Sequence, residues 1–194
     1  MPASLDWLQG KFTIFKKSNT MERNLSVFLG AILLAIWPLQ AQSEVSPAGG
    51  CTCCTESHLA FDFWVGEWEV RTPEGQLAGT NRIEKREGGC VLQEHWVGAS
   101  GDTGTSLNYY NAATGQWEQL WADSSGQVLK LAGRGQDGRM ELSSQPFRDG
   151  EGHKRVHRIT WTLQADGSVR QLWELLEGEA VVKTLFDGIY RPLK

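Results

Sequence analysis

Few residues of this chain have the type and spacing that a reaction would require. The sequence contains no Gly-x-Ser-x-Gly, no His-Glu-x-x-His and no glycine-rich phosphate loop ahead of a helix. Glu94 and His95 are neighbours, so on one strand they point to opposite faces and cannot act together. Glu94 and His157 are the candidates for a general acid or base, which in a cavity could support isomerisation or hydration. A surface or core histidine is the alternative interpretation of His157.

Tryptophan is frequent in the part of the chain that could form a domain, since seven of the nine tryptophans follow residue 43. An indole ring gives a large apolar area and one hydrogen-bond donor, which suits a cavity for a flat or apolar ligand. The predicted ligand-binding residues are five tryptophans as walls and three polar anchors: Trp68, Trp96, Trp121, Trp161, Trp173, Glu94, Gln171 and Arg158. The alternative is that the rings only fill a small barrel, with Asn81 and Gln119 in a hydrogen-bonded network that closes it.

The four cysteines fall into a cluster and a single residue. Cys51, Cys53 and Cys54 lie close together, and Cys90 stands alone. In an oxidising compartment this pattern predicts a disulfide that joins Cys53 or Cys54 to Cys90, and the spacing does not choose between them. A metal site built from Cys51, Cys53, Cys54 and His58 is the weaker alternative, because Cys-x-Cys-Cys lacks the paired spacing of a zinc ribbon. No cofactor is predicted.

Residues 1–43 have the composition of a leader. A charged start after Met21, an apolar run over residues 25–39 and small residues up to Ser43 are the three parts of a secretory signal. We therefore expect the true start at Met21, cleavage after Ser43 and a periplasmic or secreted protein. An uncleaved membrane anchor is the alternative, although the apolar run is shorter than a bilayer span requires.

The remainder of the chain is acidic. Residues 44–194 hold 15 Lys and Arg against 21 Asp and Glu, a net charge of −6, and the basic residues are scattered. Phosphate backbones require a clustered positive face, so nucleic acid is not an expected partner, and neither is a membrane once the leader is cleaved. Residues 44–57 are predicted to be an irregular tail, and residues 58–194 a single domain. The number of subunits is left open.

The domain is a series of short runs of β-branched and aromatic residues separated by Gly, Asp, Asn and Ser. Ten runs predict strands: 64–72, 77–87, 90–97, 105–110, 116–122, 128–133, 139–144, 156–163, 169–176 and 181–190. Connections such as Asp137-Gly138 favour hairpins, because these residues tolerate the positive φ of tight turns. Large residues occur on both faces of several strands. A closed antiparallel up-and-down barrel of about ten strands explains that better than an open sheet.

A set of motifs runs from Phe61 to Arg191, beginning with the FDFWxGEW opening: Phe61-Asp62-Phe63-Trp64-Val65-Gly66-Glu67-Trp68, Gly88-Gly89-Cys90, Glu94-His95-Trp96, Asn108-Tyr109-Tyr110, Trp121-Ala122-Asp123, Arg170-Gln171-Leu172-Trp173-Glu174 and Phe186-Asp187-Gly188-Ile189-Tyr190. Together they resemble a family of uncharacterised secreted bacterial proteins, a domain of unknown function placed among the calycin-like barrels with lipocalins and nitrobindins as distant relatives. The resemblance implies that Trp68 caps one barrel end beneath a basic residue of the last strand, here Arg191. The histidine that binds haem in nitrobindins lies near the C-terminus, and this chain has no histidine after His157.

Three hypotheses share this fold and differ in what the barrel contains. The first is an exported binding protein for a small apolar or aromatic molecule, and the second is an enzyme that uses Glu94 or His157 as acid or base. The third is a filled barrel that acts as an interaction or structural module. An apolar pocket favours the first, a raised carboxylate pKa beside an open cavity favours the second, and the absence of a cavity favours the third. We expect binding rather than catalysis.

Overall fold

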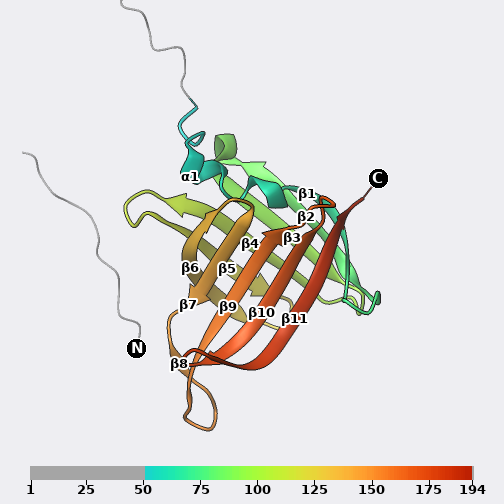
Figure 1. The fold of residues 1–194 in the computed structure, drawn as a ribbon, viewed down its shortest axis with the longest axis vertical. Helices are drawn as coiled ribbons and strands as arrows, with labels where there is room; N and C mark the ends of the chain where they lie inside the picture. The colour runs from blue at the N-terminus through green and yellow to red at the C-terminus, as the bar shows by residue number, and fades with distance from the viewer. Residues whose placement is uncertain (1–50, 194) are drawn as a thin grey trace, which may run out of the picture. The chain divides into compact units, whose positions relative to one another are not determined.

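The computed structural model describes residues 51–193, so the predicted leader and the start at Met21 lie outside the described residues. Figure 1 shows a barrel of long antiparallel strands with a short helical segment at one end. The barrel strands are β1 (Gly66–Arg71), β2 (Leu77–Arg86), β3 (Val91–Gly98), β4 (Thr103–Asn111), β5 (Gln116–Asp123), β6 (Val128–Gln136), β7 (Arg139–Ser144), β9 (Lys154–Leu163), β10 (Val169–Glu177) and β11 (Ala180–Pro192). The short elements are α1 (Glu56–Leu59), η1 (Asp62–Trp64), η2 (Glu87–Gly89) and β8 (Phe147–Arg148).

The sheet closes on itself. Consecutive strands pair antiparallel from β1 to β7, β7 then pairs with β9, and β8 forms only a two-residue ladder beside β9. The last strand, β11, returns to the first with Tyr190 opposite Val70. Closure removes the free edges that an open sheet would expose. The predicted fold class is confirmed as a closed, antiparallel, up-and-down barrel of ten strands, which is consistent with calycin-like barrels.

Side-chain alternation places one face of each strand inside. On β5, Trp117 and Gln119 are buried inside the barrel. Leu120, the next residue, points to the outer face and is 41 % exposed. The hairpin between β6 and β7 turns at Asp137 and Gly138, both of which have the positive φ expected from the sequence. Local periodicity and turn chemistry are therefore enough to explain most of the strands.

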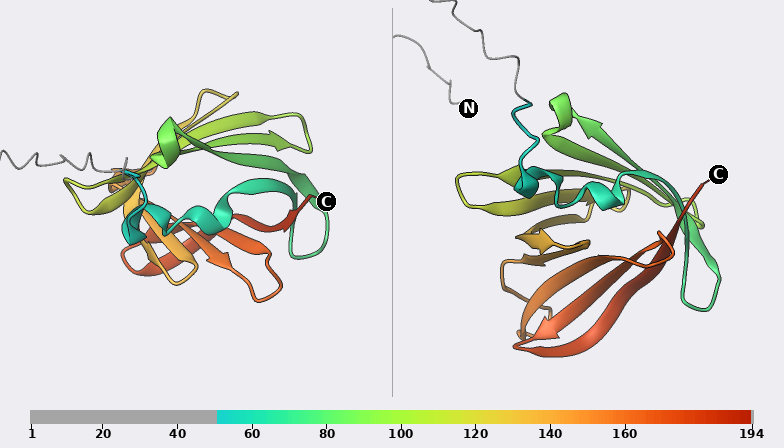
Figure 2. Two further views of the ribbon diagram at one scale, coloured as in Figure 1. Left: turned by 90° about the horizontal axis from the view of Figure 1, so that it is seen from above. Right: turned by 45° about the horizontal axis from the view of Figure 1, so that its top comes forward.

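The main departure from the expected elements is at the start of the domain. The first strand begins at Gly66, because Trp64 belongs to η1, where it is fully buried. Phe61 stacks on Trp64 with ring centroids 4.9 Å apart and meets Trp117 and Trp161 edge-on. In Figure 2 the segment with α1 and η1 crosses the end of the strand ring. We call Phe61, Trp64 and Trp117 the aromatic plug, since they fill this end of the barrel.

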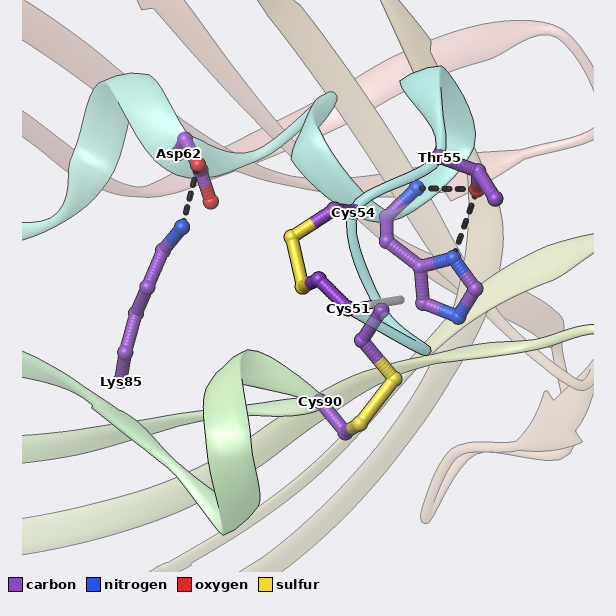
Figure 3. The surroundings of a disulfide bond; sticks show 8 residues. Cys51, Cys54, Thr55, Asp62, Lys85 and Cys90 are labelled. Carbon is purple, nitrogen blue, oxygen red and sulfur yellow. Dashed lines mark hydrogen bonds and ion pairs between the residues drawn. A yellow bond between two sulfur atoms is a disulfide. The ribbon is translucent and has the colours of Figure 1, made fainter. Parts of the chain in front are cut away.

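Two disulfides hold the segment that leads into the plug. Cys53 is bonded to Cys90, which follows η2, and Cys51 is bonded to Cys54. Figure 3 shows both bonds beside the ion pair of Asp62 with Lys85, 2.5 Å between carboxylate oxygen and Nζ. The structure thus selects Cys53 of the two partners left open for Cys90.

Within residues 51–193, no helix is long and apolar enough to cross a membrane.

Candidate functional site

The barrel contains a cavity of about 430 Å³. Asp102, in the connection between β3 and β4, and Ser124 and Ser125, in the connection between β5 and β6, also line it, and we call this end of the cavity its mouth. This volume lies within the range of ligand pockets, which is about 300–1,000 Å³. Its lining comes from seven of the ten barrel strands and these two connections: Ala78, Glu94, Trp96, Asp102, Gln119, Trp121, Asp123, Ser124, Ser125, Leu129, Ile159, Trp161, Gln171, Trp173, Leu185, Phe186 and Tyr190.

Aromatic rings form most of the walls, and two glycines make room for them. A Cβ atom at Gly104 would lie 2.1 Å from the Trp121 ring, and one at Gly79 would lie 2.8 Å from the Trp96 ring. The rings of Trp96 and Phe186 meet edge-on with centroids 6.0 Å apart. Rings held in this way present fixed apolar surfaces to the cavity.

Glu94 brings a carboxyl group into this aromatic surrounding. It lies on β3 with only 4 % of its surface exposed. Its Oε1 accepts from the Asn81 side-chain amide at 2.7 Å, and its Oε2 accepts from the Ser106 hydroxyl at 2.6 Å. Burial raises the pKa of Glu94 to about 7, although the bonds from Ser106 and Asn81 oppose the shift. A carboxyl with this pKa can hold or release a proton near neutral pH.

A second hydrogen-bonded group lies on the opposite side of Asn81. Tyr190 donates to Gln171 Oε1 at 2.5 Å, and Trp161 Nε1 donates to the same oxygen at 3.1 Å. The Asn81 amide also lies 3.5 Å from the Tyr190 hydroxyl. Burial and the charge of Glu94 raise the pKa of Tyr190, so its hydroxyl remains a donor at neutral pH.

The network also extends the other way, toward β5. Ser106 accepts from Asn108 Nδ2 at 2.8 Å, and Asn108 Oδ1 accepts from Gln119 at 2.8 Å. A continuous polar belt therefore crosses the interior from β5 to β9, and we name it by its members: Gln119, Asn108, Ser106, Glu94, Asn81, Tyr190, Gln171 and Trp161. Asn81 Oδ1 is buried without a hydrogen-bond partner in the described part of the chain. Asn81 and Gln119 are thus members of a hydrogen-bonded network inside the barrel, as one of the sequence-based interpretations proposed. Gln119 also lines the cavity.

Two carboxylates stand at the mouth. Asp102, just before β4, accepts from the Ser100 hydroxyl and from Trp96 Nε1 at 3.3 Å, and these bonds lower its pKa. Asp123, at the end of β5, accepts from the hydroxyl of Ser125 at 2.6 Å, and this bond is the main reason that its pKa is lowered. Both groups are therefore ionised at neutral pH.

Most of the predicted wall residues meet at the cavity. Trp96, Trp121, Trp161 and Trp173 line it together with the predicted anchors Glu94 and Gln171. Trp68 does not line it, because its ring is buried near the plug, where Nε1 donates to the Trp64 carbonyl at 3.0 Å.

Two other predicted residues lie beside the cavity rather than on its lining. Arg158 alternates with the inward-facing Ile159 and pairs with Glu174 at 2.8 Å on the outer face. His157 accepts from Trp173 Nε1 at 3.0 Å and stacks on Phe147, and burial lowers its pKa. It contacts the cavity wall at Trp173.

The structure corrects one further expectation and disfavours one alternative. Arg191 lies opposite Glu69 in the ladder between β1 and β11, so it shares the outer face with Glu69 and does not stack on the inward Trp68. The alternative was a metal site built from the three clustered cysteines and His58. The disulfides leave none of these cysteines as a free thiolate, and His58 is hydrogen-bonded to Thr55.

Sequence reasoning missed several residues of the cavity. Tyr190, Phe186, Asp102 and Asp123 line it but were not selected. Alternation along β11 could have placed Phe186 and Tyr190 on one face, because residues two and four apart share a side. No local signal marks Asp102, and Asp123 stands out only as part of the Trp121-Ala122-Asp123 motif; both are ordinary turn residues until the barrel brings their loops together.

No protein-family model and no curated protein sequence matches this chain. Evidence for its function therefore comes from the cavity itself.

Proposed function

We propose that this chain is an exported barrel that binds a small organic molecule of aromatic or apolar character. The observation that carries the proposal is the cavity of about 430 Å³, whose walls are aromatic and whose polar groups are few and fixed. Ligand sites combine an apolar concave surface with a small number of placed polar groups in this way. A completely filled barrel, the third hypothesis, would not leave this space.

The export part of the proposal is supported by the cysteines. All four are in disulfides, and such bonds persist in oxidising compartments. A native mass spectrum of the protein exported from a host with its leader would report cleavage, oxidation and any retained ligand. We expect a mass lost on denaturation that equals a small organic molecule.

Binding in the cavity can be tested with N-phenyl-1-naphthylamine, an uncharged aromatic dye whose fluorescence rises in apolar surroundings. Ala78 lines the cavity, so Ala78→Phe should fill part of it and weaken binding at least tenfold. Ala122→Phe is the matched control, because Ala122 lies beside Trp121 on β5 and points to the outer face. Equal affinity in both variants would place the dye outside the cavity and count against the proposal.

A second candidate function is acid or base chemistry by Glu94. The observation that favours it is a carboxyl with a pKa of about 7 on the lining of a cavity. A suitable probe is 5-nitrobenzisoxazole, which loses its C3 proton to a base as its N–O bond breaks to give a nitrile and a phenolate. We expect turnover that rises as pH increases through about 7, because only the carboxylate accepts the proton.

The matched variants decide whether Glu94 is that base. Glu94→Gln should abolish the pH-dependent turnover, while Glu141→Gln, at an ion-paired position outside the cavity, should retain it. If Glu94→Gln turns over the probe as fast as the original protein, Glu94 is not the base and the enzyme candidate fails.

A further inference from the structure

The charged groups of the cavity are all of one sign. Its ionisable lining residues are Glu94, Asp102, Asp123 and Tyr190, and no Lys, Arg or His lines it in the described part of the chain. A cleft with apolar walls and charges of one sign concentrates the field inside it. The cavity therefore repels anions and attracts cations before any specific contact forms.

The cavity carboxyls differ from the carboxyls of the outer face. On the outer face, Asp187 pairs with Arg170 at 2.7 Å and Glu174 pairs with Arg158 at 2.8 Å. Within residues 51–193, Glu94, Asp102 and Asp123 have no ion-pair partner. The hydrogen bonds that they accept come from neutral groups, so the protein leaves uncompensated the charge of Asp102 and Asp123, and that of Glu94 when it ionises.

The mouth places two of these charges close to indole rings. Asp102 accepts a hydrogen bond from Trp96, and Asp123 closes the strand that carries Trp121. Phe186 meets Trp96 edge-on across the same space. An indole face attracts a cation through its quadrupole, and the attraction is strongest when the cation is weakly hydrated, as a quaternary ammonium is.

From these observations we infer that the cavity binds organic cations, namely quaternary or protonated amines attached to an apolar or aromatic body. This inference rests on the proposed binding function and specifies its ligand class. The ammonium group lies at the mouth between the Asp102 and Asp123 carboxylates and the indole rings of Trp96 and Trp121. The apolar body extends toward the polar belt, where Glu94 offers acceptor oxygens. Carboxylate ligands of similar size are excluded, since nothing in the lining neutralises them.

The test uses three probes with one aromatic body and different charge. Benzyltrimethylammonium is the cation, neopentylbenzene is its uncharged carbon isostere, and 4-phenylbutyrate is the anion. Binding is followed by the indole N–H signals in nuclear magnetic resonance titrations. We expect the cation to bind at least tenfold more tightly than the isostere, to weaken as salt is added, and the anion to cause no shifts.

Matched charge variants locate the preference. Asp102→Asn combined with Asp123→Asn should reduce the preference for the cation to less than threefold and leave the isostere unchanged. Asp187→Asn removes one outer-face charge and should leave the preference intact. Equal binding of cation and isostere, or tighter binding of the anion, overturns this inference and leaves the proposed binding function in place. If none of the probes nor the uncharged dye binds, the proposed function itself fails.

Discussion

At the scale of single residues, Glu94 is the most informative side chain of the protein. It is buried among rings and amides, yet it has no basic partner in the described residues. A structural ion pair would have been easier to accommodate, as the outer face shows at Arg170 and Asp187. A carboxyl kept in this environment favours a role toward something that enters the cavity.

The Glu94 carboxyl should make stability depend on pH in a definite direction. Its pKa is about 7 in the folded protein and 4.5 ordinarily, so the folded state binds the proton more tightly than the unfolded state. The resulting contribution to the free energy of unfolding is fully present below about pH 4.5 and is lost as pH rises through 7. In Glu94→Gln this loss is absent, because the amide does not ionise. Urea denaturation measures this difference. Between pH 4.5 and pH 8, the free energy of unfolding of Glu94→Gln should rise by about 3 kcal/mol relative to that of the original protein.

A contrasting variant controls for general effects of charge removal. Hydrogen bonds, chiefly from Arg155, lower the pKa of Asp149 to about 2, so its stabilising effect is lost only as pH falls below its ordinary value of 3.8. Asp149→Asn should therefore follow the original protein between pH 4.5 and pH 8. A Glu94→Gln curve that also runs parallel to the original would mean that Glu94 does not ionise in this range.

At the scale of elements, the segment before β1 is attached by a covalent bond and by packing. The Cys53–Cys90 disulfide (Figure 3) joins it to the turn between β2 and β3 across a sequence separation of 37. Cys53 is buried. The Cys51–Cys54 bond closes a separation of only 3, between two exposed residues. The entropy removed from the unfolded chain grows with the length of the closed loop, so the two bonds should differ in effect.

Removing each disulfide in turn should reveal this difference. We expect Cys53→Ser with Cys90→Ser to lower the free energy of unfolding by about 4 kcal/mol, and Cys51→Ser with Cys54→Ser by about 2 kcal/mol. Urea denaturation under non-reducing conditions measures both. A larger loss from the second pair would show that the short loop, rather than the link to β3, holds the segment in place.

At the scale of the whole molecule, the barrel is divided into a filled half and an open half. The aromatic plug occupies one end, and the cavity opens at the connections between β3 and β4 and between β5 and β6. Trp161 connects the two, since it contacts Phe61 of the plug and lines the cavity. The plug therefore closes the barrel without obstructing the candidate binding site.

This division predicts that a plug residue stabilises the entire barrel. Phe61 is fully buried and contacts Trp64, Trp117 and Trp161, so Phe61→Ala should cost about 3–5 kcal/mol. Phe147→Ala is the control, because Phe147 is 36 % exposed and should cost less than about 1 kcal/mol. Tryptophan fluorescence and circular dichroism should report one common transition. Two separate transitions would show that the plug unfolds independently of the barrel.

Sequence patterns are enough to predict the ten barrel strands and their hairpin connections, because alternation and turn residues act within about ten positions, as at Asp137-Gly138. Large residues on both faces of several strands then favour closure over an open sheet. The sequence also placed Trp96, Trp121, Trp161 and Trp173 as inner residues of their strands. Arg158 was selected as an anchor although its alternation with Ile159 puts it outside, so that choice departed from a pattern already visible in the sequence.

What the inner residues do together depends on the folded barrel. The Asn81 amide and the Tyr190 hydroxyl are 109 positions apart in the chain and 3.5 Å apart in the barrel. Whether the rings fill the interior or leave a cavity depends on the register of all ten strands and on glycines such as Gly104. The pairing of Cys90 with Cys53 depends likewise on where η1 lies against the barrel end. The polar belt, the cavity and the disulfide pairing all depend on contacts between residues far apart in the chain, and local sequence patterns do not encode such contacts.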